Sequence, residues 1–157
     1  MTGTLQTEIG PIGYEITPRG VSRITFGPAL NDGGGPEVPV ALKRRIEKAL
    51  ERYFAGDARA IDDVPVDLAG TPFQKKVWGA LRRIPAGRTR SYGEVARMIG
   101  RPTASRAVGA ANRANPVPIV VPCHRVIAAD GSLHGYAGSL DRKAWLLKHE
   151  GWQTPGA

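Results

Sequence analysis

The chain has 157 residues, 41% of them hydrophobic and 23% charged, which is ordinary for a globular protein of one domain or two small ones. Its single cysteine excludes an internal disulfide, no apolar run approaches the length of a membrane span, and the first residues lack the basic and apolar regions of a signal peptide. These features exclude a disulfide-stabilised secreted domain and a membrane-spanning chain, and they predict a cytoplasmic protein.

The positive charge is concentrated in the second half of the chain. Up to Gly70 there are eight basic and ten acidic residues, a net charge of −2, whereas from Thr71 onward there are fourteen basic and four acidic residues, a net charge of +10. Such a basic half suggests a polyanionic partner such as nucleic acid, although a well-solvated surface would have the same composition.

Residues 1–70 are expected to form a small α/β domain. Short runs of partly alternating polarity at 4–9, 13–17 and 21–26 are separated by Gly and Pro, which predicts a small antiparallel sheet. Apolar residues at helical spacing predict a helix over 41–55. No residue in this half carries evident chemistry, so we interpret it as a supporting domain.

Residues 71–157 are expected to form a mainly helical domain. Thr71-Pro72-Phe73-Gln74 is a capping box with proline at the first helical position, and Ser91-Tyr92-Gly93-Glu94 is a second capping box, opening a helix that runs to about Ile99. A third helix follows over about 104–114. Two short helices joined by a tight turn with glycine are typical of a helix-turn-helix. The fold class predicted for the whole chain is therefore α+β.

The third of these helices is unusual because most of its residues are Ala or Gly, and Arg106 and Arg113 provide its only long side chains. A helix that reads bases in the major groove normally presents Asn, Gln, Arg or Glu to the base edges. This composition favours recognition of DNA shape and phosphates over sequence reading. Arg88, Arg90 and Lys143 are further candidates for phosphate contacts, but they suit a solvated surface equally well.

Asn115 to Val126, read as NPVPIVVPCHRV, contains the lone Cys123 followed directly by His124. The apolar residues 119–121 predict a short buried strand, and Pro122 cannot continue a strand because it lacks an N–H. A thiol beside an imidazole at a rigid chain end is a candidate nucleophile, although a lone cysteine is more often a small buried hydrophobe. A final helix is predicted from Ser139 or Leu140 to Gly151.

Several motifs, in the same order, resemble the O6-alkylguanine-DNA alkyltransferases, also called methylated-DNA–protein-cysteine methyltransferases. Pro122-Cys123-His124-Arg125-Val126 is similar to the active-site signature of that family. Ser105 to Gly109 and Asn115-Pro116 resemble its recognition helix and the following asparagine hinge, and Leu146 to Gly151 resembles its closing helix. The resemblance covers about residues 71–151, and residues 1–70 are compatible with the variable N-terminal domain of the family.

The resemblance implies a direct-reversal DNA repair protein. It would flip an O6-alkylguanine out of duplex DNA and move the alkyl group to its own Cys123 in a single turnover, with O4-alkylthymine left open as a substrate. Glu150 would orient His124, which would take the thiol proton through a water, and Tyr92 would neutralise the departing guanine. Asn115 would hold the turn between the recognition helix and the active-site segment.

The resemblance also implies a DNA interface and a base pocket. Arg106 would enter the minor groove and fill the gap left by the flipped base, with little preference for sequence. The DNA-binding residues would be Arg106, Tyr92, Arg113, Ser91 and Ala104, and the pocket residues would be Tyr136, Ala137, Val126 and Pro118. We expect a monomer that needs no cofactor and no metal, because the chain lacks the N-terminal cysteines that form a zinc site in some relatives.

Three other functions stay open at this point. The first is a non-catalytic alkyltransferase-like protein that binds damaged DNA; the presence of Cys123 argues against it. The second is a cysteine hydrolase, although adjacent Cys and His rarely bond directly and no oxyanion-hole motif is visible. The third is a helix-turn-helix regulator that senses redox state through Cys123, against which the alanine-rich helix counts.

Overall fold

The computed structural model describes residues 1–31, 34–133, 136 and 139–153. The chain forms two compact units, one made of residues 1–69 with 116–120 and the other of residues 70–115 with 121–157. Residues 116–120 therefore pack with the first unit, although they follow the helix-turn-helix in sequence. The described residues form a small antiparallel sheet and five α-helices, which confirms the predicted α+β class.

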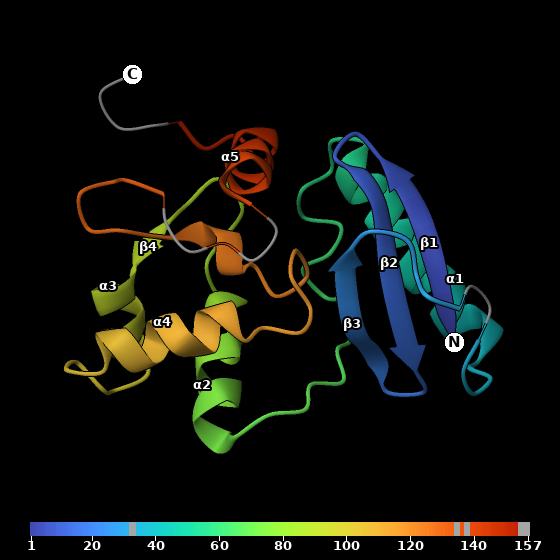
Figure 1. The fold of residues 1–157 in the computed structure, drawn as a ribbon, viewed down its shortest axis with the longest axis horizontal. Helices are drawn as coiled ribbons and strands as arrows, with labels where there is room; N and C mark the ends of the chain where they lie inside the picture. Colours follow the sequence, from blue (N-terminus) through green and yellow to red (C-terminus); the bar gives the residue numbers. More distant parts are fainter. Residues whose placement is uncertain (32–33, 134–135, 137–138, 154–157) are drawn as a thin grey trace. The chain divides into compact units, whose positions relative to one another are not determined.

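A three-stranded antiparallel meander forms the sheet of the first unit, in the order β1 (Thr2–Thr7), β2 (Gly10–Thr17) and β3 (Gly20–Phe26) (Figure 1). The predicted strands are confirmed with boundaries shifted by a few residues. Side chains on alternate positions of β2, among them Ile12 and Ile16, are buried, as expected for a sheet with one covered face.

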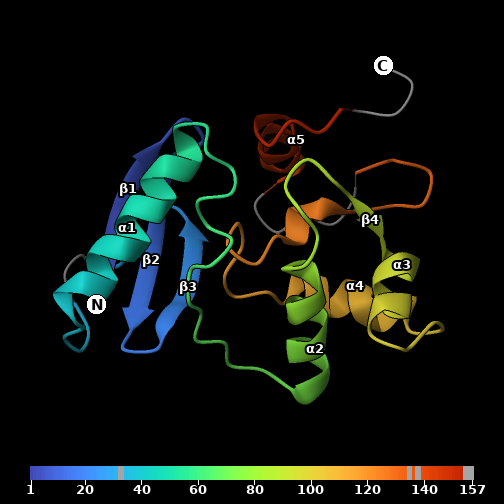
Figure 2. The ribbon, with the colours of Figure 1, turned by 180° about the vertical axis from the view of Figure 1, so that it is seen from behind.

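Helix α1 (Val40–Phe54) crosses one face of this sheet, which Figure 2 shows from the helix side. Its apolar stripe of Ile46, Leu50 and Tyr53 is fully buried. Residues 116–120 pack within the same unit, where the backbone N–H of Ile24 in β3 donates to the carbonyl of Pro116 at 3.0 Å.

The second unit is built on three helices: α2 (Pro72–Leu81), α3 (Tyr92–Met98) and α4 (Ser105–Arg113). Both predicted capping boxes are present: the Thr71 and Ser91 side chains accept from the backbone N–H three residues on, and Gln74 and Glu94 bond back. Helices α3 and α4 form the predicted helix-turn-helix.

Helix α2 supports this pair because it packs against α4. The indole Nε1 of Trp78 donates to the carbonyl of Ala111 at 2.8 Å, so this large, fully buried side chain is fixed to α4 by a directional bond as well as by packing.

The prediction of a strand over residues 119–121 is wrong. These residues are buried, but Ile119 has a φ of 76° and the chain turns there, with the N–H of Val120 donating to the carbonyl of Pro118 at 3.0 Å. A β-branched residue rarely adopts this conformation. Pro118 and Pro122, which flank the run, have no N–H of their own and cannot extend a ladder on either side. The apolar character of the run therefore reflects burial and not strand pairing.

A two-stranded parallel sheet was not anticipated. β4 (Arg90–Ser91) pairs with β5 (Val126–Ile127), which joins the start of α3 to the segment directly after Cys123. Between Pro122 and β5, residues Cys123–Arg125 form the single-turn 3₁₀-helix η1.

The last helix, α5 (Leu140–His149), ends with Glu150 as its C-cap, and Gly151 follows with a φ of 93°. A glycine in the left-handed region stops the helix at this point and so fixes where the Glu150 side chain starts. None of the helices in the described part of the chain is long and apolar enough to cross a membrane.

Candidate active site

Cys123 is the first residue of η1 and only 5% of its surface is exposed. Burial raises the pKa of its thiol to about 11, although the Asn115 amide, the Lys143 ammonium and the backbone N–H groups of Cys123 and His124 favour the thiolate. At neutral pH the thiol therefore keeps its proton at rest, and attack by sulfur requires a base.

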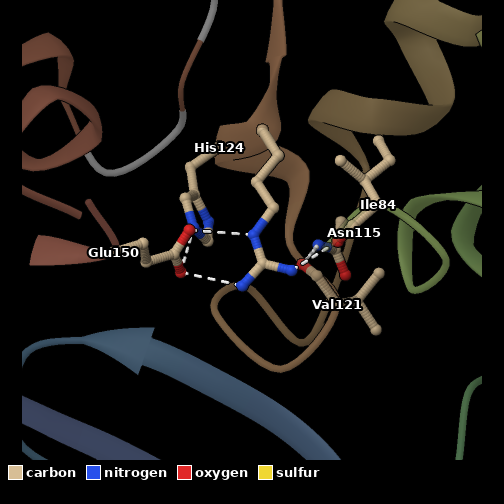
Figure 3. Close-up of polar contacts among 6 residues, drawn as sticks. Ile84, Asn115, Val121, His124 and Glu150 are labelled. Carbon is tan, nitrogen blue, oxygen red and sulfur yellow. Dashed lines mark hydrogen bonds and ion pairs between the residues drawn. The ribbon is translucent and has the colours of Figure 1, made fainter. Parts of the chain in front are cut away.

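Glu150 bonds both residues that follow Cys123, His124 and Arg125, and Figure 3 shows its carboxylate facing the His124 ring. His124 Nε2 lies 2.8 Å from Glu150 Oε2, and Arg125 donates to both carboxylate oxygens, from Nε to Oε1 at 2.8 Å and from Nη2 to Oε2 at 2.9 Å. Arg125 Nη1 also donates to the Ile84 carbonyl at 2.6 Å. The side chains of this cluster are at most 3% exposed.

The charges of the cluster fix the state of the imidazole. Burial opposes ionisation of Glu150, but the charges and hydrogen bonds of His124 and Arg125 outweigh burial and hold the pKa of this carboxyl well below its usual range. Burial lowers the pKa of His124, more than Glu150 raises it. A neutral imidazole beside a carboxylate carries its proton on Nε2, which leaves Nδ1 as an acceptor.

The second nitrogen of His124 is thus suited to take a proton. Nδ1 is buried and has no hydrogen-bond partner within the described ranges. Because its other nitrogen donates to a carboxylate, the ring is fixed in orientation and made more basic than a free neutral imidazole. The arrangement supplies a general base next to the only cysteine.

Two asparagines of the second unit hold the backbone around the thiol. Asn115 Nδ2 donates to the Val121 carbonyl at 2.8 Å, and Asn112 Nδ2 donates to the Cys123 carbonyl at 3.3 Å. Asn112 comes from α4, so this helix and the cysteine segment are joined by a direct bond. The Asn115 bond ties the residue that follows α4 and its C-cap to the segment before Cys123, and the hinge role of Asn115 stays a prediction.

Tyr92 is the first residue of α3 and is half-buried. Its ring faces α4, because a Cβ at Gly109 would lie 3.7 Å from Tyr92 Cδ1. Burial raises the pKa of its hydroxyl, which the charge of Arg113 opposes and that of Cys123 reinforces. The charges of Tyr92 and Cys123 therefore interact, and Tyr92 stays protonated at neutral pH. Its role as a proton donor stays a prediction.

The solvent-exposed surface of α4 has the predicted composition. Arg106 and Arg113, seven residues apart, are both exposed, and so are the small residues Ala107 and Ala110 between them. Ser91 is the N-cap of α3, and Ala104 precedes α4 as its N-cap, without a capping side chain.

The residues expected to form a base pocket belong to different segments of the chain, and three of the four are described. Tyr136 is buried, with its ring 6.4 Å from that of His124 at an angle of 85°. Val126 is buried in β5, where its carbonyl accepts from Lys143 Nζ at 2.6 Å. Pro118 is buried in the first compact unit. Ala137 lies outside the described residues.

Sequence reasoning missed three polar side chains of the site, namely Arg125, Asn112 and Lys143, all at most 2% exposed. The interpretation of Lys143 as a surface cation is wrong, because this side chain is fully buried. Its neighbours Leu146 and Leu147, three and four residues on, are also buried, so helical spacing places Lys143 on the buried stripe of α5. That spacing was a usable signal.

The raised pKa of Cys123 predicts a steep pH dependence for its reaction with a small electrophile. Iodoacetamide should react slowly at neutral pH and about tenfold faster per pH unit between about pH 6 and pH 8, since only the thiolate reacts. The measurement is the alkylation rate by mass, with the unfolded chain as the control for an ordinary thiol. A rate that is flat over this range would mean that the resting thiol is already ionised.

Comparison with known proteins identifies the family to which the chain belongs. Residues 72–152 match the family model described as the DNA-binding domain of 6-O-methylguanine DNA methyltransferase. A methylated-DNA–protein-cysteine methyltransferase of Methanosarcina acetivorans is 57% identical over 149 residues, which cover 93% of this chain and 95% of that protein. The chain belongs to this alkyltransferase family.

The relationship extends to other members. The Shigella flexneri methylated-DNA–protein-cysteine methyltransferase is 56% identical over 103 residues, which cover 66% of this chain and 60% of that protein. The matched region thus spans less than two thirds of that relative. The crystal structure of Mycobacterium tuberculosis OGT in complex with DNA superimposes with a TM-score of 0.79 and 40% identity, covering 95% of this chain and 91% of that one. The family resemblance and the fold class are confirmed.

Within the part of the chain that the structure describes, no three His, Cys, Asp or Glu side chains are grouped so that they could hold a metal ion. The cluster of His124, Glu150 and Arg125 has an arginine where a metal would need a further ligand.

Proposed function

We propose that this protein repairs DNA by direct reversal, moving the alkyl group of an O6-alkylguanine to Cys123 in a single turnover. The observation that carries the proposal is a lone, buried cysteine beside a neutral histidine that is held by a buried carboxylate–arginine pair. Residues 71–157 would bind DNA and accept the alkyl group, and residues 1–70 would support them.

The reaction balances with the side chains at hand. His124 Nδ1 takes the Cys123 thiol proton through a water, and the sulfur attacks the sp³ carbon attached to O6. A C–S bond forms while the C–O bond breaks, and the electron pair of the C–O bond goes to the guanine. Tyr92 donates its hydroxyl proton to the guanine anion, and the proton held on His124 returns to the tyrosinate through solvent.

Burial of the Cys123 thiol explains why His124 must already be neutral and oriented before the substrate binds. With a pKa of about 11, roughly one Cys123 in 10⁴ is a thiolate at pH 7. The thiol is thus protected from chance electrophiles until a substrate lies in place. His124 is neutral and oriented by Glu150, so it can accept the proton at that moment without prior rearrangement.

Double-stranded DNA is the proposed partner, bound through the minor groove by α4. The exposed Arg106 and Arg113 flank small residues on this helix, which lets the backbone approach DNA closely without reading base edges. Affinity should therefore fall steeply with salt and vary little with sequence. We propose a monomer that acts in a reducing, cytoplasmic compartment, where a single free thiol persists.

Transfer is tested by incubating the protein with duplex DNA that carries a labelled O6-methyl group. The label should move to the protein in at most a one-to-one ratio and leave guanine in the DNA. Binding without transfer would favour a damage-binding relative, and binding that depends on sequence but not on O6-methylguanine would favour a regulator.

Arg106 supplies a prediction about base flipping. Arg106→Ala should slow repair of duplex DNA by about tenfold to a hundredfold while leaving the reaction with free O6-benzylguanine within about twofold, because only the duplex needs its gap filled. Arg101→Ala, which removes an exposed cation outside α4, is the control. Single-turnover rates on the two substrates check this, and equal losses on both would remove the base-flipping role.

A further inference from the structure

Lys143 is a buried cation for which the proposed chemistry has no use. It lies on α5, its side chain is fully buried, and its Nζ donates to the Val126 carbonyl at 2.6 Å. Val126 follows Cys123 by three residues, directly after η1. A lysine is rarely buried completely, because desolvating an ammonium is costly.

The cost of burying this ammonium appears in its pKa. Burial lowers the pKa of Lys143 to about 8, although attraction to Cys123 opposes that shift. The same attraction lowers the pKa of Cys123. The two side chains thus belong to one electrostatic unit, in which an ammonium favours the thiolate and a thiolate favours the ammonium.

The neighbouring charges determine which anion the Lys143 ammonium can stabilise. Besides Lys143, the charged side chains around the thiol are Arg125 and Glu150, which bond each other through both carboxylate oxygens, and Arg113, whose charge acts on Tyr92. His124 is neutral and Tyr92 is protonated. When His124 removes the thiol proton, the new charge on sulfur arises in a site that already contains a positively charged lysine.

We infer that Lys143 is a positioning residue whose buried ammonium, fixed on the Val126 carbonyl, stabilises the thiolate of Cys123. Its place in alkyl transfer rests on the proposed function. The ammonium donates no proton to the substrate and forms no bond with it. It makes the ionisation of a buried thiol less unfavourable, and η1 and α5 hold it in place before the reaction starts.

This inference predicts an effect of Lys143 that depends on pH. Below about pH 8 the lysine is charged and assists ionisation, and above this value it loses its proton and with it the effect. Lys143→Met should therefore lower the rate of Cys123 with iodoacetamide by about tenfold at pH 7, equivalent to one pKa unit. The ratio of wild-type to variant rates should shrink towards one as the pH rises past about 9.

Two further variants separate charge from hydrogen bonding. Lys143→Gln keeps a donor for the Val126 carbonyl without a charge and should behave like Lys143→Met, whereas Lys143→Arg keeps the charge and should stay closer to wild type. Lys148→Met, which removes an exposed lysine of the same helix, is the matched control and should change nothing. Thermal melting of each variant confirms that it is folded.

The outcomes are distinct. A Lys143→Met rate equal to wild type at pH 7, or a loss that is the same at all pH values, overturns the inference; so does a Gln variant that retains the full rate. The wild type gives an independent test without any substitution: its log rate should rise less steeply above about pH 8, and a straight line to about pH 10 contradicts the role. Iodoacetamide needs no DNA, so failure of the wild type to accept an alkyl group from DNA would refute the proposed function alone.

Discussion

Replacing Cys123 by serine should abolish alkyl transfer and leave DNA binding within about twofold of wild type. A serine hydroxyl ionises far less readily than a thiol, and a neutral histidine acting through a water cannot make up the difference. The exposed arginines of α4 are untouched by the change, so affinity for duplex DNA should persist. The measurements are labelled-methyl transfer and DNA binding at one salt concentration.

Cys123→Ala serves as the second variant, because it removes the side-chain hydrogen bonds as well as the nucleophile. Both variants should bind O6-methylguanine DNA without consuming it. Transfer that persists in either variant would assign the acceptor to another side chain and would end the proposed mechanism.

Replacing Arg125 by methionine should cost about 3–5 kcal/mol of unfolding free energy, the usual result of removing one partner from a buried ion pair. Arg125 makes two bonds to Glu150 and a third to the Ile84 carbonyl, and its side chain is 3% exposed. Its loss leaves a buried carboxylate that is bonded to a neutral imidazole. Alkyl transfer should fall too, since Glu150 then no longer holds His124 in one orientation.

A matched control is available in Arg52→Met. The Arg52–Asp57 pair is equally short at 2.8 Å, but its side chains are 60% and 43% exposed, so its loss should cost at most about 1 kcal/mol. Urea denaturation of both variants measures the two costs. Equal, small losses would mean that burial of the Arg125–Glu150 pair does not matter for stability.

The pKa of Glu150 also predicts how stability depends on pH. Its pKa is lower in the folded than in the unfolded state, so it stabilises the fold above the unfolded pKa of about 4.3, and this contribution is lost as the pH falls towards the folded pKa. In Arg125→Met the folded pKa should rise, and acid destabilisation should therefore begin at a higher pH than in the wild type.

The local signals in the sequence were strong wherever they depended on backbone chemistry. The capping boxes at Thr71 and Ser91 predicted the starts of α2 and α3, because a side chain that bonds the first free N–H groups acts within four residues. The alternation in residues 1–26 likewise predicted the meander. The family resemblance supplied the Cys123, His124 and Glu150 grouping, which spacing alone does not contain.

What the sequence could not supply was contact between distant segments. The turn at Ile119 followed from two prolines acting on a run that is apolar enough to be a strand. The β4–β5 pair joins residues more than thirty positions apart through two residues each, too short for a periodic signal. Composition also does not reveal the buried partners of two cations, namely the Glu150 carboxylate for Arg125 and the Val126 carbonyl for Lys143, although helical spacing could have placed Lys143 on the buried stripe of α5.

The most direct test of the account is the intact mass of the protein after incubation with duplex DNA containing O6-methylguanine. We expect the mass to increase by a single methyl group, in proportion to the DNA added until every molecule has reacted, with the group located on Cys123 by peptide mapping. A mass that stays unchanged while the damaged DNA is bound, or a methyl group on any other residue, would contradict the central claim.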